Sequence, residues 1–149
     1  MNEEIAGLLH RENMTLASIQ KRSLAFLIDE VLLSLLLMVV LWDSFIGAKT
    51  TEDIIYVVNS FVLEYMFMKI VYQAFFVMKY GATLGKIVMK IRVIEVKTLQ
   101  TPNVMVALNR GIFRVISEMF FYFGFLWGIL DPNRQALHDK TAKTLVIDA

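Results

Sequence analysis

Charged side chains interrupt the apolar stretches of this sequence, and these are the positions where chemistry could take place. Asp29 and Glu30 lie inside the first apolar stretch, and Glu64 and Lys69 lie inside the second. An Asp, Lys or Arg at the centre of a membrane helix costs about 2.5 to 3.5 kcal/mol, so such residues usually serve pairing or function. A buried carboxylate beside a cation can change its protonation near neutral pH. The pattern therefore predicts a path for a small ion or solute.

The rise of a helix places several of these charges at similar depth. Measured from the centres of their helices, Asp29 lies ~6 Å and Lys69 ~4.5 Å toward the same side of the membrane, whereas Glu64 lies ~3 Å toward the other side. Arg22 precedes Asp29 by two helical turns, about 10 Å, and the small Ala25 between them permits close helix approach. We therefore expect Arg22, Asp29 and Lys69 to form a polar track.

A structural interpretation of the same charges is also open. In this alternative, ion pairs of Asp29 with Lys69 and of Glu64 with Arg114 hold the helices together. Arg114 belongs to a polar stripe at helical spacing in the third apolar stretch, which comprises Asn103, Arg110, Arg114, Ser117 and Glu118.

The composition limits the classes of protein that this chain can belong to. It has 149 residues, 57% hydrophobic and 19% charged, whereas soluble domains are roughly 45–50% apolar and 25% charged. The net charge of +1 gives no basic excess for nucleic acid, and the absence of Cys excludes disulfides and thiolate chemistry. Only two His are present, and they are far apart in the sequence, so we expect no metal site and no cofactor.

Two short motifs do not predict enzymatic chemistry. The segment 81–86 has three residues between its glycines and no Ser or Thr after Lys86, so it is not a phosphate-binding loop. His138 and Asp139 are adjacent, and on a strand they would point to opposite faces, so we interpret them as a turn residue and a cap. We expect that the chain is not an enzyme.

The elements that must position the charges are helical. The sequence predicts an all-α membrane protein of one domain over 1–149, with full spans at 24–42 and 54–78. A third segment at 104–130 is broken or re-entrant, since its uncharged part after Phe120 is too short to span. Short strands are expected in the loop 79–103 and at the end of the tail 131–149. The first twenty residues fit an amphipathic helix or a solvated tail.

The distribution of basic residues predicts the orientation. Basic side chains cluster before the first span, after the second span and in the tail, so all three regions should be cytoplasmic. Three full crossings would put the tail on the opposite side from the loop. A break near Gly124 or Gly128 that makes the third segment re-entrant resolves this conflict.

Three ordered motifs resemble the RDD family of small bacterial membrane proteins. They are Arg22 to Asp29, the segment 81–86 with Arg92 and Val93, and the segment 137–146. The Arg and the first Asp of the family fall on Arg22 and Asp29, and the second Asp falls on Asp139, with Asp131 as the alternative. Arg110 also stands where the family tends to carry an Arg. Lys143 in place of a common Gly, and the extra carboxylate of Glu30, depart from the family pattern.

The resemblance implies a protein of the bacterial inner membrane and a suspected transport role. Our leading hypothesis is a transporter of a small ion or solute, in which Asp29 titrates, Arg22 and Lys69 tune it, and Asp139 is a cytoplasmic latch. So short a chain encloses little volume, so we expect a homo-oligomer in the bilayer. The alternative is an adaptor or assembly factor whose membrane charges pair with another membrane protein.

Overall fold

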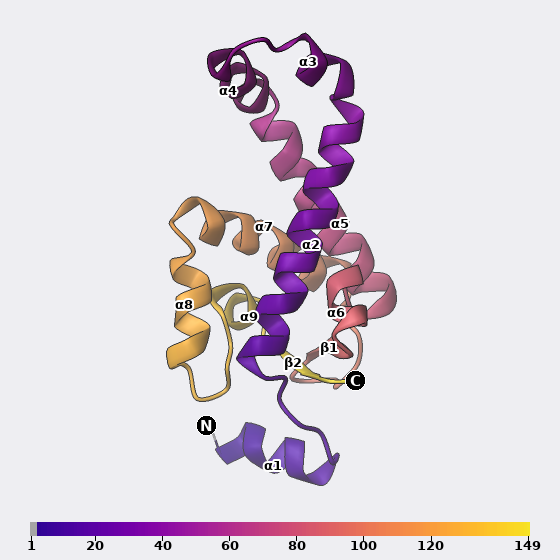
Figure 1. Ribbon diagram of the computed structural model, residues 1–149. Coiled ribbons are helices and arrows are strands. Elements are labelled where there is room, and N and C mark those ends of the chain that lie inside the picture. The colour runs from indigo at the N-terminus through magenta and orange to yellow at the C-terminus, as the bar shows by residue number, and fades with distance from the viewer. Residues whose placement is uncertain (1–2) are drawn as a thin grey trace.

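The computed structural model describes residues 3–149, and it is mostly helical (Figure 1). The elements follow one another as α1 (Glu3–Arg11), α2 (Ile19–Val40), α3 (Trp42–Gly47), α4 (Thr51–Ser60), α5 (Val62–Tyr80), α6 (Leu84–Val88), β1 (Ile91–Glu95), α7 (Val104–Met119), α8 (Phe123–Leu130), α9 (Leu137–Thr141) and β2 (Thr144–Asp148). The predicted fold class, a helical membrane protein with a short β element, is confirmed.

Helix α2 is long and apolar enough to cross a membrane by itself. Ser18 caps its first turn by accepting a hydrogen bond from the backbone of Lys21. Its side chains at Ala25, Asp29 and Leu33 are buried, and these positions repeat at the spacing of one helix face. Most of its other apolar side chains are exposed, as expected for a helix that faces lipid.

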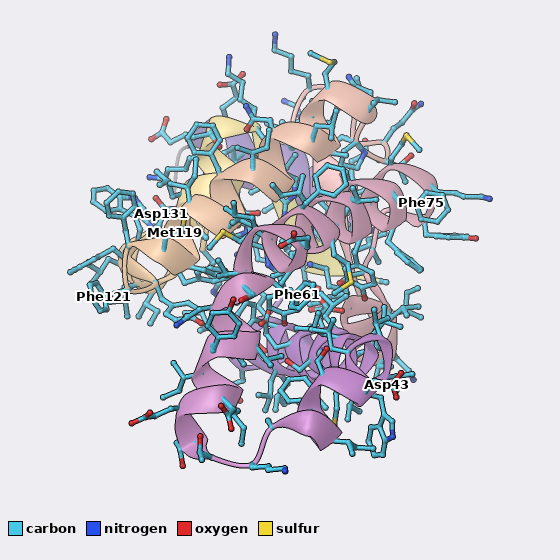
Figure 2. The ribbon with its side chains drawn as sticks, turned by 90° about the horizontal axis from the view of Figure 1, so that it is seen from above. Asp43, Phe61, Phe75, Met119, Phe121 and Asp131 are labelled. Carbon is cyan, nitrogen blue, oxygen red and sulfur yellow. The ribbon has the colours of Figure 1, made fainter. Side chains whose placement is uncertain are left out.

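The second and third apolar stretches are both bent. Helices α4 and α5 meet at Phe61 with a bend of 51°, and α7 and α8 meet with a bend of 105°. Each pair is long and apolar enough to span a membrane only when its two helices are taken together, so residues 3–149 contain one clear span and two bent pairs. The third segment is therefore broken, as predicted. Figure 2 shows the side chains of Phe75 on α5 and Phe121 beside α8 at the periphery, pointing away from the helices.

The sharp turn between α7 and α8 comes earlier than the predicted glycines. Phe121 and Tyr122 both adopt left-handed backbone conformations, with φ of 51° and 62°. Gly124 instead allows close packing, because a Cβ at this position would lie 2.1 Å from the Ser117 hydroxyl oxygen. The glycine thus lets α8 fold back against the end of α7.

The loop and the tail form a two-stranded antiparallel sheet. Strand β1 pairs with β2 in a register that places Ile91 opposite Asp148 and Glu95 opposite Thr144. Both predicted strands are confirmed, and they pair with each other. Helix α1 packs on this sheet through Ile5 and Leu9, which lie in one cluster with apolar side chains of both strands. The helical interpretation of the N-terminal segment is therefore confirmed, and the solvated tail is wrong.

The two ends of the molecule are built from different elements. Helix α1, both strands and the start of α2 lie together at one end, and α3 and α4 lie at the other (Figure 1). Helix α7 packs against α5 in the middle, where Gly111 lets the two backbones approach, since a Cβ there would lie 3.2 Å from the Ile70 carbonyl oxygen. This middle layer holds the charged side chains described next.

Candidate functional site

Asp29 lies at the centre of a hydrogen-bond network that attaches α6 to α2. Its carboxylate is fully buried and accepts hydrogen bonds from the Tyr72 hydroxyl at 2.7 Å, the Thr83 hydroxyl at 2.7 Å and the Gly85 backbone N–H at 2.8 Å. Gly85 is required for this contact, because a Cβ there would lie 2.1 Å from the Ala25 carbonyl oxygen. Ala25, the small residue expected to permit close helix approach, therefore lies against α6.

The expected pair between Asp29 and Lys69 is wrong. The Lys69 ammonium instead donates to Glu30 at 2.8 Å and to Glu118. Successive residues on a helix point about 100° apart, so Asp29 is directed to α6 and to Tyr72 on α5, while Glu30 is directed to Lys69. Equal depth in the membrane does not place two side chains on facing sides of their helices.

The expected pair between Glu64 and Arg114 is also wrong. Arg114 donates to Gln73 at 2.6 Å and lies 3.4 Å from Glu118, 3.6 Å from Glu30 and 3.8 Å from Asp29. Glu64 is exposed and makes no ion pair within residues 3–149. It precedes Gln73 by nine residues, or ~13.5 Å of helix, which is too far for the side chain of Arg114.

Four residues thus form what we call the buried charge cluster: Glu30 from α2, Lys69 from α5, and Arg114 and Glu118 from α7. Two carboxylates balance two cations where the three helices meet, and Asp29 lies beside the cluster, 3.8 Å from Arg114, held by its own three hydrogen bonds. Glu30 is the most accessible member, with its side chain 21% exposed, and its Oε1 atom lacks a hydrogen-bond partner among the described residues. The predicted path residues Lys69 and Glu30 meet here with two members of the third-segment stripe.

Asp139 is the centre of a second charged group, outside the apolar spans. It forms ion pairs with Arg22 at the start of α2 and with Arg110 on α7, and it accepts the Ala136 backbone N–H at 3.0 Å. Burial alone would raise the pKa of Asp139, but the two guanidinium groups outweigh burial and hold this pKa well below its usual range. Asp131 lies apart from this group and pairs with Lys140.

His138 and Asp139 lie on helix α9 and not on a strand, and both are buried. The His138 Nε2 atom lies 3.7 Å from an Asp139 carboxylate oxygen. The two side chains therefore lie side by side and do not point to opposite faces, as they would on a strand. Burial lowers the pKa of His138 well below its usual value and keeps the ring neutral. The capping role expected for Asp139 is confirmed by its bond to the Ala136 N–H.

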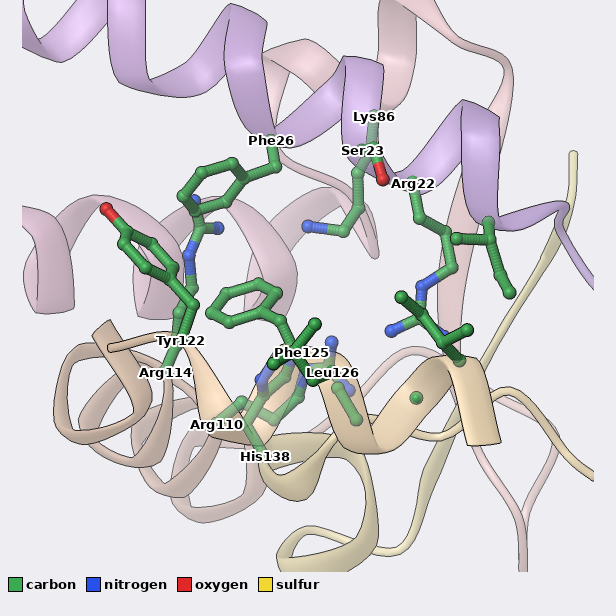
Figure 3. Close-up of a pocket in the computed structure, with 14 residues that line it drawn as sticks. Arg22, Ser23, Phe26, Lys86, Arg110, Arg114, Tyr122, Phe125, Leu126 and His138 are labelled. Atoms are coloured by element: carbon green, nitrogen blue, oxygen red, sulfur yellow. The ribbon is translucent and has the colours of Figure 1, made fainter. Parts of the chain in front are cut away.

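A cavity of about 280 Å³ lies between α2 and α8, beside both charged groups. Its polar lining includes Arg22, Lys86, Arg110, Arg114 and His138 (Figure 3). Lys86 was not expected as a site residue, because it lies in a basic loop whose charges were used only to predict the orientation. Its position directly after Gly85, the residue against α2, was the available signal. In the part of the chain that the structure describes, no group of three His, Asp or Glu side chains could hold a metal ion.

Comparison with known proteins supports the motif analysis. A model of the RDD family matches residues 16–143. No match was found among curated proteins or among solved structures. The matched stretch contains Arg22, Asp29, Arg110 and Asp139, which the structure places in the two buried networks. The match covers most of the chain, and the chain therefore belongs to the RDD family.

Proposed function

We propose that this membrane protein moves a proton or a small cation across the bilayer, and that the buried charge cluster is the exchange site. The observation that carries the proposal is that Lys69 bridges two carboxylates, Glu30 and Glu118, at the meeting point of three apolar helices. Intramembrane ionisable groups of this kind mark ion and proton pathways more often than they serve structure alone.

The charge balance of the cluster gives a physical reason for exchange. Two carboxylates and two cations sum to zero, so an added cation would leave a net charge in a medium of low dielectric constant. That cost is avoided when the Lys69 ammonium releases a proton to the opposite side as the cation enters, because two carboxylates, Arg114 and the cation again sum to zero. Glu30 and Glu118 are the groups that would alternate between Lys69 and the transported ion, and Arg114 holds both carboxylates in place.

Asp29 has a different part in this proposal from the one expected from the sequence. Its carboxylate already accepts three hydrogen bonds, from the Tyr72 and Thr83 hydroxyls and the Gly85 backbone N–H, and two of these donors belong to α6 and the residue before it. We assign Asp29 to positioning, since it connects α6 to α2 one residue before Glu30.

The proposed arrangement in the membrane is a multi-pass protein of the bacterial inner membrane with a cytoplasmic N-terminus. The observation that supports it is that α1, β1 and β2 share one end of the molecule, with α3 and α4 at the other. Helix α2 then crosses outward and the α4–α5 pair returns, while the α7–α8 pair re-enters on the side of the sheet. A homo-oligomer would supply the walls that so short a chain lacks.

Flux in proteoliposomes loaded with a pH dye tests the proposal under imposed sodium, potassium and proton gradients. Glu118→Gln should abolish flux, and because it leaves Lys69 and Arg114 with one carboxylate fewer, its melting curve in detergent is measured alongside to confirm that the variant is folded. Glu64→Gln is the matched control on an exposed carboxylate and should keep full flux. Flux in Glu118→Gln equal to that of the natural chain would refute the exchange site. No flux from well-folded natural protein would favour the adaptor.

A further inference from the structure

The cavity between α2 and α8 carries an excess of positive charge. Fourteen described residues line it, and they include Arg22, Lys86, Arg110 and Arg114 but neither Asp nor Glu. Figure 3 shows the side chains of Arg22 and Lys86 pointing into the space between the two helices. The carboxylates that pair with the arginines do not line the cavity, and one of them, Asp139, forms ion pairs with both Arg22 and Arg110.

Lys86 is a buried ammonium group without a carboxylate partner. Its residue is only 9% exposed, and within residues 3–149 it forms no salt bridge. Its ammonium donates to the Thr83 hydroxyl at 3.3 Å, an oxygen that already serves Asp29. Burial, and then the nearby Arg114, lowers the pKa of Lys86 to about 7. Burying a charge without a partner costs desolvation free energy, and an anion bound in the cavity would offset that cost.

Two other buried polar atoms of the lining residues lack partners. They are Arg110 Nε and His138 Nδ1, neither of which has a hydrogen-bond partner among the described residues. Arg110 is 1% exposed and His138 is 5% exposed. Buried polar groups are almost always satisfied in folded proteins, so these two atoms leave the polar wall of the cavity incompletely satisfied, and the free donors that face the cavity are those of Lys86 and Arg22.

The remaining wall of the cavity is apolar and faces outward. Phe26, Phe125, Leu126 and Ile129 line it, and the last two are about half exposed, at 49% and 56%. Helix α8 carries apolar residues on every exposed position, so the mouth of the cavity meets hydrocarbon when the chain lies in a membrane. A ligand that enters here would have a charged group inside and an apolar body along α8.

We propose that this cavity binds the phosphate group of an anionic glycerophospholipid, with the acyl chains lying against α8. Phosphate oxygens accept hydrogen bonds from the Lys86 ammonium and the guanidinium groups of Arg22 and Arg110, which present planar donors suited to phosphate. A volume of about 280 Å³ admits the phosphate and its glycerol, while the acyl chains stay outside. Arg114 belongs to this wall and to the buried charge cluster, so a bound lipid lies beside the proposed exchange site. The binding itself does not depend on the proposed transport.

Native mass spectrometry of the delipidated protein in neutral detergent, titrated with phosphatidylglycerol, tests the site. We expect one lipid per chain with saturation, and binding weaker by at least about tenfold in Lys86→Met. Lys97→Met removes the same charge from an exposed position and should bind like the natural chain. Ser23→Glu adds a carboxylate to the wall of the cavity without removing a cation, and it should weaken binding equally. Because this variant keeps Lys86, weaker binding in both variants cannot come from a folding defect caused by the loss of Lys86.

The comparison ligands distinguish the source of the phosphate. Phosphatidylcholine should bind at least about tenfold more weakly, because its choline brings a further cation to a cationic cavity. Equal binding of phosphatidylcholine, or unchanged binding in Lys86→Met and Ser23→Glu, would overturn the proposal. Binding of inorganic phosphate that phosphatidylglycerol does not displace would assign the cavity to free phosphate and overturn the lipid assignment.

Discussion

The guanidinium group of Arg22 donates to the carboxylate of Asp139, although 117 positions of sequence separate the two residues. Arg22 lies in the first turn of α2, and Asp139 lies on α9. The same guanidinium donates to the Arg134 carbonyl, so one side chain fastens two parts of the C-terminal segment to the first long helix. The resemblance assigned both residues to the family motif, and the structure brings them into contact.

Replacing Asp139 with Asn should strongly destabilise the protein. The change leaves Arg22 and Arg110 without their shared carboxylate, and breaking a buried ion pair typically costs about 3 to 5 kcal/mol. Thermal unfolding in detergent measures the loss. Asp148→Asn is the control, since its pair with Lys21 is partly exposed and such pairs contribute at most about 1 kcal/mol. Equal melting temperatures for the two variants would contradict this assignment.

Acidification should remove the contribution of Asp139. Its pKa is lower in the folded protein than in the unfolded chain, so the unfolded chain binds more protons as the pH falls through the range below about 4. The stabilisation is complete above that range and is lost toward lower pH. The melting temperature of the natural chain should therefore fall more steeply between about pH 4 and pH 2.5 than that of Asp139→Asn. Parallel curves would argue against this linkage.

Adding one methyl group at Gly85 should disrupt the attachment of α6 to α2. The Cβ of Gly85→Ala would lie 2.1 Å from the Ala25 carbonyl oxygen and 2.9 Å from an Asp29 carboxylate oxygen. Because the first obstacle is backbone, the helices must separate, and overpacking of this kind costs about 1 to 3 kcal/mol or more. Gly7→Ala is the control, since nothing lies within 4 Å of its Cβ position. Its melting temperature should equal or slightly exceed the natural value, because Ala favours a helix more than Gly does. A melting temperature of Gly85→Ala at the natural value would show that the contact is not tight.

The stability of the protein without bound lipid should increase with pH because of Lys86. Its pKa is about 7 in the folded chain against 10.5 for the free side chain, so between these values the unfolded chain binds more protons. The free energy of unfolding therefore rises from pH 7 toward pH 9. Lys86→Met should be more stable than the natural chain at pH 7 and should show a smaller rise. Melting curves of delipidated protein at several pH values check this, and identical slopes would exclude Lys86 as the cause.

Reporter fusions can test the membrane arrangement. The β1–β2 pairing requires the loop and the tail to share one side, so fusions after Gln100 and at Ala149 should report the same compartment. An insertion at Ala48, between α3 and α4, should report the opposite compartment. Opposite signals from Gln100 and Ala149 would contradict the re-entrant α7–α8 pair.

Much of the architecture follows from patterns along the chain. Length and hydropathy predict α2 and the second apolar stretch, because a membrane span is a local property of about 20 residues. The charge distribution and the shortness of the uncharged part of the third segment predict its break, and alternation predicts both strands. The membrane class was therefore accessible from the sequence by itself, and the RDD family, with Arg22, Asp29 and Asp139 as its motif residues, came from the resemblance of three ordered motifs.

The pairing of the buried charges was decided only by the tertiary structure. Asp29 and Glu30 are neighbours in sequence, yet one faces Thr83 and Gly85 while the other faces Lys69. Depth along a helix can be counted from residue numbers, but the rotation of one helix against another depends on small contacts such as those of Gly85 with Ala25 and Gly111 with Ile70. Close packing at these glycines sets which side chains meet, and no local pattern contains that information.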